Sequence, residues 1–333
     1  MIIIIFLRKK IKKSLSELIS SIPLFLISLN KNKVMKYIYL LTLSMLFVLT
    51  SCNQGKSKID KSVRKVGVLL VNHGSHSKKW RKLLLDVEDA TRNSILNHQD
   101  IAGVKTAFME YTEPSIATQM KAFDKEGFDE VIVVPLFLTV SSHYSHDIPV
   151  ILGLSADPKI KGKLIKEKIE VYKPSARVTI TPPLDYSTIL KKNIERRVKN
   201  LSKDAENEGV LLVAYGDAQY NQQWEEMVDE IGKYLQIKTG HSSIAYSWCG
   251  HLVSYSTQPT KDGIKKLHEL ENYVIVIPVL VANDPYFQDE IIQTAVNEVE
   301  NSENVIYIQD AILPDDNLNK WVISISHKIA NEL

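Results

Sequence analysis

The sequence predicts an α/β protein with two similar lobes, each built on a parallel sheet flanked by helices, and with a cleft between the lobes. Three observations lead to this prediction. Short apolar runs rich in β-branched residues alternate with segments whose apolar residues recur at helical spacing. The order of these segments occurs twice along the chain. The runs VIVVPLF and VIVIPVL stand at corresponding places in the two halves. Alternating strands and helices favour parallel sheets covered on both faces.

The first half contains four expected strands, separated by expected helices. The strands are expected at residues 66–72, 104–110, 130–138 and 176–180. The helices are expected at residues 79–96, 115–127 and 186–201. Gly127 is of the type that commonly ends a helix, and Asp147 followed by Pro149 has the pattern of a helix N-cap. We therefore expect a further helix to begin after Asp147.

The second half repeats this order. GVLLVAYGDAQYNQQW, from Gly209, corresponds to GVLLVNHGSHSKKW, from Gly67, and the later strand and helix segments correspond in the same way. We therefore expect a first lobe of residues 66–203 and a second lobe of residues 208–333, of common ancestry and each closed by its own last helix. Because the duplicated chain supplies both lobes, we expect a monomer.

Residues 1–52 are expected to be a targeting region and not part of the fold. After Met35 the apolar run YIYLLTLSMLFVLTSC has the length of a signal peptide and is short for a membrane span. Its end, LTSC, resembles the lipobox of bacterial lipoproteins, which implies that Cys52 is lipidated and becomes the N-terminus. An uncleaved membrane anchor is the alternative. Polar residues 53–65 then form a tether, and the protein lies in the cell envelope, held to a membrane and facing the periplasm or the exterior.

The composition excludes several classes of protein. The 333 residues are 44% hydrophobic and 24% charged, which suits a globular protein of two ordinary domains. A formal net charge of +2 gives no indication of a nucleic-acid partner. The two cysteines, Cys52 and Cys249, cannot form a disulfide framework, and neither belongs to a Cys-x-x-Cys pair of a structural zinc site.

Side chains that can bind a metal ion follow three expected strands of the first lobe. His73 and Gly74 end the first strand, Glu110 ends the second, and His143 follows the third. Ligands of parallel α/β sheets bind at the carboxyl ends of the strands, so we expect these groups to converge. Two imidazoles and a carboxylate form a candidate divalent-metal site with open positions, and Gly74 permits a tight turn or the close approach of a flat ligand.

Several neighbouring residues have competing interpretations. Glu113 competes with Glu110 as the acidic group, and position favours Glu110. His146 is either an auxiliary ligand or, as we favour, a surface residue at a helix start. In the second lobe, His251 is a candidate to face the shared cleft. Cys249 is either a soft ligand or, as is usual at a strand end, a small buried hydrophobe.

The basic run after His73 also has two interpretations. It consists of Lys78, Lys79, Arg81 and Lys82. The run either attracts carboxylates of a ligand or forms a solvated helix face, and we favour the solvated face.

These motifs together resemble the sirohydrochlorin chelatases of the CbiX type, in the class II chelatase superfamily. The strand ending in HGS, then FMEYTEPS, VVPLFL and HYSHDIP occur in family order, and the two-lobed length resembles the long form of the family. The resemblance implies a chelatase-like fold. It also implies a lyase that inserts Co²⁺ or Fe²⁺, or Ni²⁺ as in relatives, into sirohydrochlorin or a related tetrapyrrole without a nucleotide, as in cobalamin or sirohaem biosynthesis. By position, His73 and His143 match the family's two active-site histidines, and Glu110 matches its acidic residue. His76 stands where the family commonly has arginine.

This activity suits the residue types. Neutral histidine or a carboxylate can accept the protons of the pyrrole N–H groups, and imidazole nitrogen with carboxylate oxygen suits Co²⁺ or Fe²⁺. Both histidines must be neutral to bind metal, so we expect activity to fall in acid.

The sequence also departs from the family pattern at Ser141-Ser142, where the family has a glycine-containing approach to the second histidine, in its second lobe and in its targeting signal. In the second lobe Tyr215-Gly216-Asp217 replaces His-Gly-Ser and Asn283-Asp284-Pro285 occupies the region of His143, so we expect this lobe to be a scaffold and the opposite wall of the cleft. The lipoprotein signal is unusual because tetrapyrrole synthesis is usually cytoplasmic. A second hypothesis is therefore an envelope lipoprotein that binds metal, haem or another tetrapyrrole for uptake without catalysis. A third is a solute-binding lipoprotein without metal.

Overall fold

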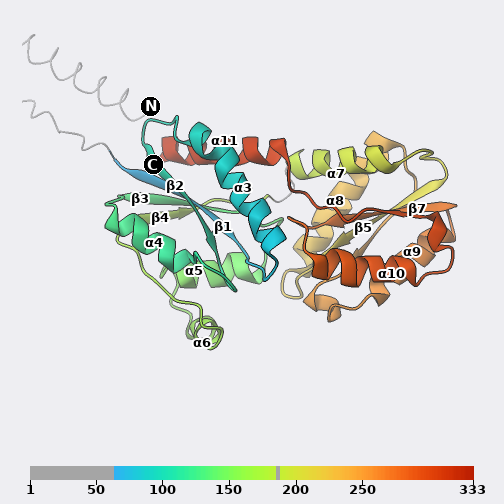
Figure 1. Cartoon of the computed structure of the whole chain (residues 1–333), viewed down its shortest axis with the longest axis horizontal. Coiled ribbons are helices and arrows are strands. Elements are labelled where there is room, and N and C mark those ends of the chain that lie inside the picture. Colours follow the sequence, from blue (N-terminus) through green and yellow to red (C-terminus); the bar gives the residue numbers. More distant parts are fainter. Residues whose placement is uncertain (1–63, 185–187) are drawn as a thin grey trace, which may run out of the picture. The chain divides into compact units, whose positions relative to one another are not determined.

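The computed structural model describes residues 64–184 and 188–333. The predicted targeting region, the lipidation site Cys52 and nearly all of the predicted tether lie outside these residues. Within them, no helix combines the length and the apolar character needed to cross a membrane. They form two sheets, each of four parallel strands flanked by helices, and the predicted fold class is confirmed (Figure 1). The cleft expected between the lobes stays a prediction.

The first sheet has the strand order β2-β1-β3-β4 with parallel pairing throughout. Its strands are β1 (Val66–Asn72), β2 (Ile101–Phe108), β3 (Glu130–Pro135) and β4 (Arg177–Ile180). Its chain also forms helices α3 (Lys78–Ile95), α4 (Ile116–Lys125), α5 (Ile148–Ile151) and α6 (Pro158–Lys166), and a π-helical segment η1 (His143–Asp147). The central strands β1 and β3 are buried along their whole length, which explains their continuous apolar sequences.

The second sheet has the corresponding order β6-β5-β7-β8, again with parallel pairing throughout. Its strands are β5 (Glu208–Ala214), β6 (Ile244–Trp248), β7 (Tyr273–Val279) and β8 (Val305–Tyr307). Its chain also forms α8 (Asn221–Thr239), α9 (Gln258–His268), α10 (Thr294–Asn297), the π-helical segment η3 (Tyr286–Gln293), and the 3-10 turns η2 (His251–Val253) and η4 (Ser302–Asn304). The sequence repeat is therefore also a structural repeat.

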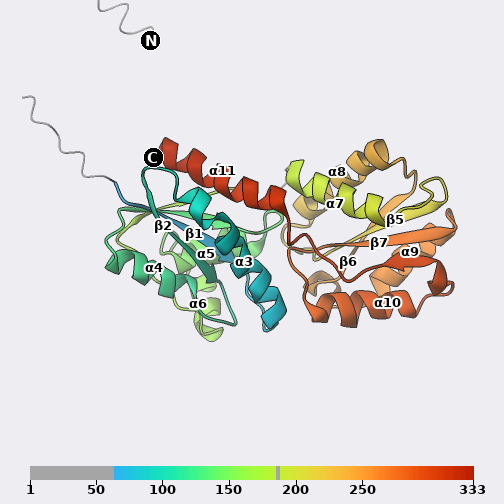
Figure 2. The same cartoon turned by 45° about the horizontal axis from the view of Figure 1, so that its top comes forward.

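The last helix of each repeat packs on the other repeat's sheet. Helix α7 (Thr188–Leu201) packs against α8 and β7, and α11 (Asp316–Glu332) packs against α3 and β3 (Figures 1 and 2). Arg197 of α7 donates a hydrogen bond to the carbonyl of Pro278 at 2.8 Å, and His327 Nε2 of α11 donates to the carbonyl of Ile95 at 3.1 Å. The lobe bounds of residues 66–203 and 208–333 stay a prediction, and the two closing helices pack across the boundary between them.

One hydrophobic core runs through both lobes as a consequence of this exchange. It joins Leu70 of β1 and Leu212 of β5 with Ile194 of α7 and Val322 of α11. The opposite face of each sheet has a separate core, which contains α4 and α5 in the first lobe and α9 in the second. Burying these apolar faces is the main source of stabilisation for such layered folds.

Two further hydrogen bonds join the lobes and are related by the duplication. Ser75 Oγ donates to Asp284 Oδ2 at 2.5 Å, and the backbone N–H of Ser142 donates to Asp217 Oδ2 at 3.0 Å. Ser75 and Asp217 occupy the same place in the HGS and YGD motifs. Each lobe thus uses the loop after its first strand to contact the loop after the other lobe's third strand, as expected for a two-fold-like contact.

Candidate metal site at the strand ends of the first lobe

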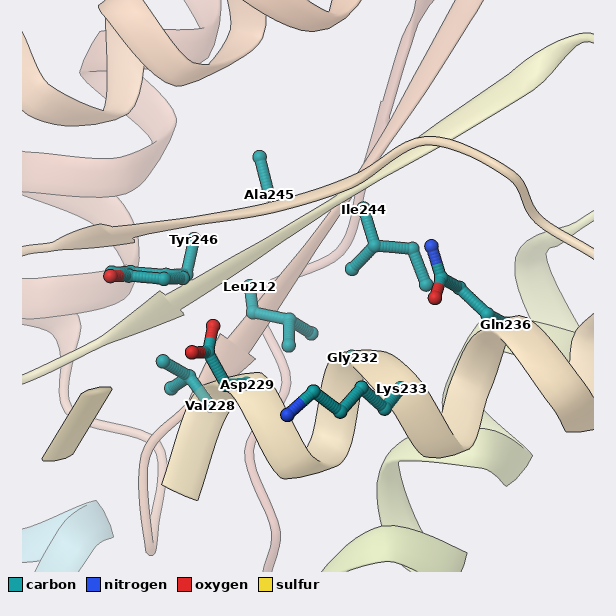
Figure 3. A pocket seen from close by; sticks show the side chains of 9 residues that line it. All are labelled: Leu212, Val228, Asp229, Gly232, Lys233, Gln236, Ile244, Ala245 and Tyr246. Carbon is teal, nitrogen blue, oxygen red and sulfur yellow. The ribbon is translucent and has the colours of Figure 1, made fainter. Parts of the chain in front are cut away.

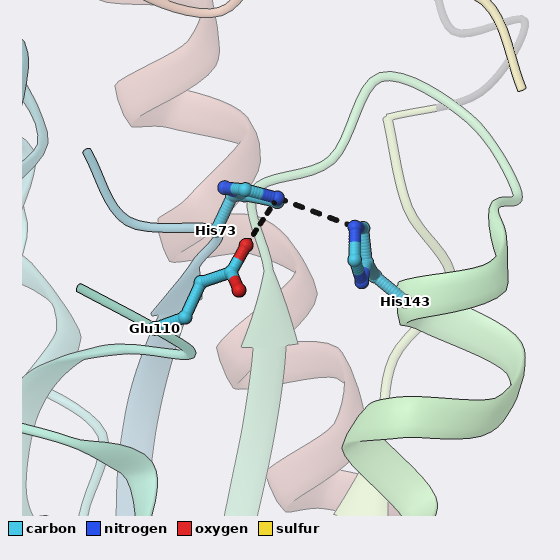
Figure 4. A group of neighbouring side chains, drawn as sticks. All are labelled: His73, Glu110 and His143. Atoms are coloured by element: carbon cyan, nitrogen blue, oxygen red, sulfur yellow. Dashed lines mark hydrogen bonds and ion pairs between the residues drawn. The ribbon is translucent and has the colours of Figure 1, made fainter. Parts of the chain in front are cut away.

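Three predicted site residues come together at the carboxyl ends of β1, β2 and β3. His73 Nε2 lies 2.9 Å from Glu110 Oε1 and 3.2 Å from His143 Nε2 (Figure 4). One ligand atom from each of the three residues lies within 4.8 Å of the other two. Among the residues that the structure describes, no other group of three His, Cys, Asp or Glu side chains converges in this way.

Gly74 allows the first two strand ends to meet. Its φ of +111° lies in the region that favours glycine, and a Cβ at this position would stand 2.0 Å from the carbonyl oxygen of Glu110. The backbone N–H of Glu110 donates a hydrogen bond to the carbonyl of His73 at 3.0 Å. This backbone hydrogen bond and the close approach at Gly74 therefore place Glu110 beside His73.

The backbone also determines which nitrogen of His73 faces the site. Nδ1 lies 3.0 Å from the carbonyl oxygen of Gly74, which can only accept, so Nδ1 carries the proton and donates it. Nε2 then points at Glu110 and His143. Burial lowers the pKa of His73, but the hydrogen bond and the negative charge of Glu110 outweigh burial and raise that pKa above 6.5. Burial raises the pKa of Glu110, but the hydrogen bond with His73 and the charge of His73 outweigh burial, so the pKa of Glu110 is lowered overall.

His143 is oriented by a carboxylate behind it. Its Nδ1 donates to Asp147 Oδ2 at 2.7 Å, and Lys163 Nζ donates to the same oxygen at 3.1 Å. Burial raises the pKa of Asp147, but the bond from His143 and the charge of Lys163 lower it overall, so this carboxylate stays ionised. Nε2 of His143 is thereby left facing His73. A carboxylate that fixes a histidine in this way is a regular partner of metal ligands.

The sequence pattern did not identify Asp147 as part of this site. We expected Asp147 to cap a helix, but its backbone has helical dihedral angles and its side chain makes no capping hydrogen bond. The helical conformation begins earlier, at His143, in a π-helical turn, which puts His143 and Asp147 four residues apart on one helical surface. The His-x-x-x-Asp spacing was the available signal, but Pro149 indicated a later helix start.

The arrangement fits a divalent metal ion. Two histidine nitrogens and one carboxylate oxygen form a donor set that suits Fe²⁺ and Co²⁺ and leaves coordination positions open for further ligands. The His73 side chain is 33% exposed and that of His143 is 21% exposed, so an ion can reach them from solvent. Asp147, behind them, is 2% exposed and serves to orient.

The alternative residues of the first lobe lie outside this cluster. Glu113 accepts from the backbone N–H of Ser115 and does not approach the histidines within the cluster. His76 stacks on Tyr111 at a ring separation of 4.7 Å. His146 Nε2 lies 2.9 Å from the Tyr220 hydroxyl, which makes it a contact between the lobes.

Cys249 follows the interpretation that the sequence favoured, and the solvated face of the basic run stays a prediction. Arg81 donates to the carbonyl of Ser75, and Lys82 pairs with Asp86, so two of the four basic residues have partners on the protein. Cys249 is fully buried, and burial raises the pKa of its thiol to about 12. Such a thiol is a small hydrophobe and a poor metal ligand.

The second lobe keeps the backbone of this site and changes its side chains. Gly250 N–H donates to the carbonyl of Tyr215, as Glu110 N–H donates to that of His73. The π-helical segment of each lobe begins eight residues after a strand proline, at His143 after Pro135 and at Tyr286 after Pro278. Tyr215, Gly250 and Tyr286 thus replace the three candidate ligands. In the second lobe, two tyrosines therefore stand at the positions of the first lobe's histidine pair.

A pocket in the second lobe lies elsewhere. It is formed between α8 and the strands β5 and β6, and Asp229, Lys233 and Tyr246 are among its lining residues (Figure 3). None of its lining residues belongs to the cluster of His73, Glu110 and His143, and none is a histidine or cysteine. It therefore offers no comparable donor set.

The part of the chain that contains these three residues is similar in sequence to known proteins. Residues 67–201 match the CbiX family. The sirohydrochlorin cobaltochelatase of Saccharolobus solfataricus is 28% identical over 133 residues, which cover 40% of this chain and 93% of that protein. The sirohydrochlorin ferrochelatase of Bacillus subtilis is 27% identical over 156 residues, which cover 46% of this chain and 52% of that protein.

Solved structures extend the similarity to both lobes. The sirohydrochlorin chelatase SirB from Bacillus subtilis subspecies spizizenii, in complex with cobalt, has a TM-score of 0.56 and 20% identity, and covers 79% of this chain and 94% of its own. The structure of CbiX, the terminal enzyme for biosynthesis of sirohaem in denitrifying bacteria, has a TM-score of 0.53 and 14% identity, and covers 79% of this chain and 99% of its own. The chain therefore has the two-lobed fold of the chelatases, and its residues 67–201 resemble the CbiX family in sequence.

Proposed function

We propose that the protein is a metal chelatase that inserts a divalent ion, Co²⁺ or Fe²⁺, into sirohydrochlorin or a related tetrapyrrole. The observation that carries this proposal is the convergence of His73 Nε2, His143 Nε2 and a Glu110 oxygen at three strand ends, with Asp147 behind His143. The names of the relatives, sirohydrochlorin cobaltochelatase and ferrochelatase, support the same reaction class. The cobalt and Fe³⁺ in the two SirB structures support the choice of metal.

The proposed reaction exchanges one ion for two protons. The metal first binds the lone pairs of His73 Nε2 and His143 Nε2 and the carboxylate of Glu110. As the ring nitrogens take the metal, the two pyrrole protons move to the histidine nitrogens that it leaves, and then to solvent. Glu110 stays ionised because its pKa is lowered. It therefore offsets charge on the metal first and on protonated His73 afterwards.

The proposal is tested by metal insertion in vitro. The full chain, purified in detergent, is mixed with metal-free sirohydrochlorin and Co²⁺ or Fe²⁺, and the absorption spectrum is followed. We expect insertion faster than the rate without protein. Binding of ring and ion without such acceleration would contradict the enzyme and leave the carrier hypothesis.

Removing the charge behind His143 is expected to weaken metal binding. In Asp147→Asn the His143 ring loses its anionic partner, so its Nε2 becomes a poorer ligand. We expect a Co²⁺ dissociation constant about tenfold higher, measured by calorimetry. Asp86→Asn, which removes the surface partner of Lys82, serves as the control and should bind as the parent does. Equal affinities for all three proteins would show that Asp147 has no part in binding.

Metal affinity is expected to fall as the pH is lowered. His73 holds a proton more tightly than a free imidazole, because its pKa is raised above 6.5, and metal must displace this proton. The charge of Glu110 does not change over this pH range, because its pKa is lowered and it remains ionised, so the loss of affinity comes from the histidines. Calorimetry between pH 8 and pH 5.5 should show Co²⁺ affinity decreasing by at least about tenfold per pH unit below the pKa of His73. A constant affinity over this range would exclude histidine ligation.

We also propose that the protein is a lipoprotein of the cell envelope, anchored through Cys52. The LTSC sequence at the end of the apolar run supports this. Cells that express the protein and are fed labelled palmitate should incorporate the label, and Cys52→Ala should abolish incorporation. Cys249→Ala, which changes the other cysteine, should keep it. Persistent labelling of the Cys52 variant would contradict the anchor.

A further inference from the structure

The second lobe gathers aromatic rings at the strand ends where the first lobe gathers metal ligands. We call these residues the aromatic cluster: Tyr215, His251, Tyr255, Tyr286 and Phe287. The Tyr215 and Phe287 rings lie 5.6 Å apart, those of Tyr286 and Phe287 5.3 Å apart, and those of Tyr255 and Tyr286 5.8 Å apart. These separations are those of aromatic rings in direct contact. The rings thus pack against one another and form one continuous aromatic surface.

The cluster has the chemistry of an aromatic surface and not of a metal site. Tyr215 and Tyr286 occupy the places of His73 and His143, and glycine occupies the place of Glu110. Burial raises the pKa of Tyr215, and its bond with the Tyr255 hydroxyl raises it further, so Tyr215 remains a neutral phenol. Its hydroxyl is occupied by Tyr255 at 3.4 Å and by His251 Nδ1 at 3.1 Å.

The cluster is open to solvent. Tyr255 is 40% exposed and Tyr286 is 43% exposed. Single exposed aromatic residues are common, but several in contact on a rigid set of strand ends indicate a binding surface. A flat ligand can lie on these rings without displacing buried side chains.

Tyr111 is a further exposed ring, next to the candidate metal site. It directly follows Glu110, its ring lies 6.0 Å from that of His73, and it is 56% exposed. Ser75, two residues after His73, donates from its Oγ to Oδ2 of Asp284, two residues before Tyr286. The loop that carries the metal site therefore meets the loop that leads into the aromatic cluster.

We propose that the aromatic cluster stacks against the flat conjugated ring of a tetrapyrrole, through Tyr255, Tyr286 and Phe287, while the first lobe presents the metal. The inference rests on the proposed function, since it names the ring as occupant. A conjugated macrocycle matches the cluster because its faces are flat and apolar while its charged carboxylates project from its edge. The second lobe is then a substrate-binding element as well as a scaffold.

The test measures ring binding and metal binding separately on the full chain. Metal-free sirohydrochlorin is titrated into the parent and into Tyr255→Leu and Tyr286→Leu, which keep apolar volume and remove the aromatic face. We expect each variant to bind the ring about 5- to 10-fold more weakly. Tyr286→Phe keeps the face and should bind as the parent does. The matched control is Tyr273→Leu, since Tyr273 is 44% exposed but stands at the start of β7, at the opposite end of the sheet.

Each outcome decides the inference. Co²⁺ binding measured on the same samples should be unchanged in the leucine variants, which shows that the first lobe is intact. Ring affinity equal to that of the parent in both leucine variants would overturn the stacking proposal, and so would Tyr286→Phe binding as weakly as Tyr286→Leu. Loss of ring binding in the leucine variants of a protein that does not accelerate metal insertion would support the aromatic site while contradicting the proposed enzyme.

Discussion

His73→Ala and His143→Ala are each expected to abolish measurable Co²⁺ binding at the site and to slow metal insertion by at least about 100-fold. Each substitution removes one of three donor atoms, and the two nitrogens are only 3.2 Å apart. Neither histidine can replace the other, because each is oriented by a separate partner, the Gly74 carbonyl or the Asp147 carboxylate. Calorimetry with Co²⁺ and the spectroscopic insertion assay provide the two measurements.

His98→Ala is the control for this pair. His98 also belongs to the first lobe, but its ring lies against His327 of α11 and is no part of the cluster. It should bind Co²⁺ and insert it at the parent rate. Parent-like insertion by both His73→Ala and His143→Ala would contradict the assignment of the site to these two histidines.

The sheets were predictable because their sequence signal is local. β1 and β3 are buried along their length, and a strand covered on both faces needs apolar side chains at successive positions. The repeated order of such runs gave the duplication, and the strand-end rule gave the meeting of His73, Glu110 and His143. In each case the residues whose pattern predicts the strand or the site are the residues that form it.

The packing of α7 and α11 on the other repeat's sheet was not predictable, because the sequence of a helix does not name the sheet that it covers. An amphipathic helix shows an apolar face, here Leu190, Ile194 and Val198 of α7, but not the sheet that this face covers. Both sheets have the same strand order, so either is a suitable partner. The choice depends on contacts distant in sequence, such as Arg197 with Asp310 and with the Pro278 carbonyl. Helix α6 was not predicted, although Asp157 caps it and Pro158 stands in its first turn.

The duplication separates what the fold requires from what the chemistry requires. Both lobes have the same bond between the first two strand ends, a glycine with positive φ after the first strand, and a π-helical turn after the third. Those features persist where the histidines are absent, so neither His73 nor His143 is needed to form them. The first lobe keeps side chains that suit a metal, and the second keeps rings that suit a flat ligand. This division favours a protein that brings an ion and a ring together.

Gly74→Ala is expected to destabilise the protein by about 3 kcal/mol and to weaken Co²⁺ binding at the same time. The new Cβ would stand 2.0 Å from the carbonyl oxygen of Glu110, and it would also hold alanine at a φ of +111°. The obstructing atom belongs to the backbone, so no side-chain rotation can relieve the contact. The strand ends must move apart, and Glu110 moves away from His73. Thermal unfolding followed by circular dichroism, with Co²⁺ calorimetry on the folded protein, measures both effects.

Gly127→Ala separates the steric contact from the backbone conformation. Gly127 also has a positive φ, +71°, but a Cβ there would meet nothing within 4 Å. This variant should lose only about 1 kcal/mol and should bind Co²⁺ normally, because left-handed backbone is its sole cost. If the two variants lost equal stability and both kept Co²⁺ affinity, the contact between Gly74 and Glu110 would have no role in the site. A larger loss in Gly74→Ala, together with weakened metal binding, would show that the backbone junction of β1 and β2 positions the ligands.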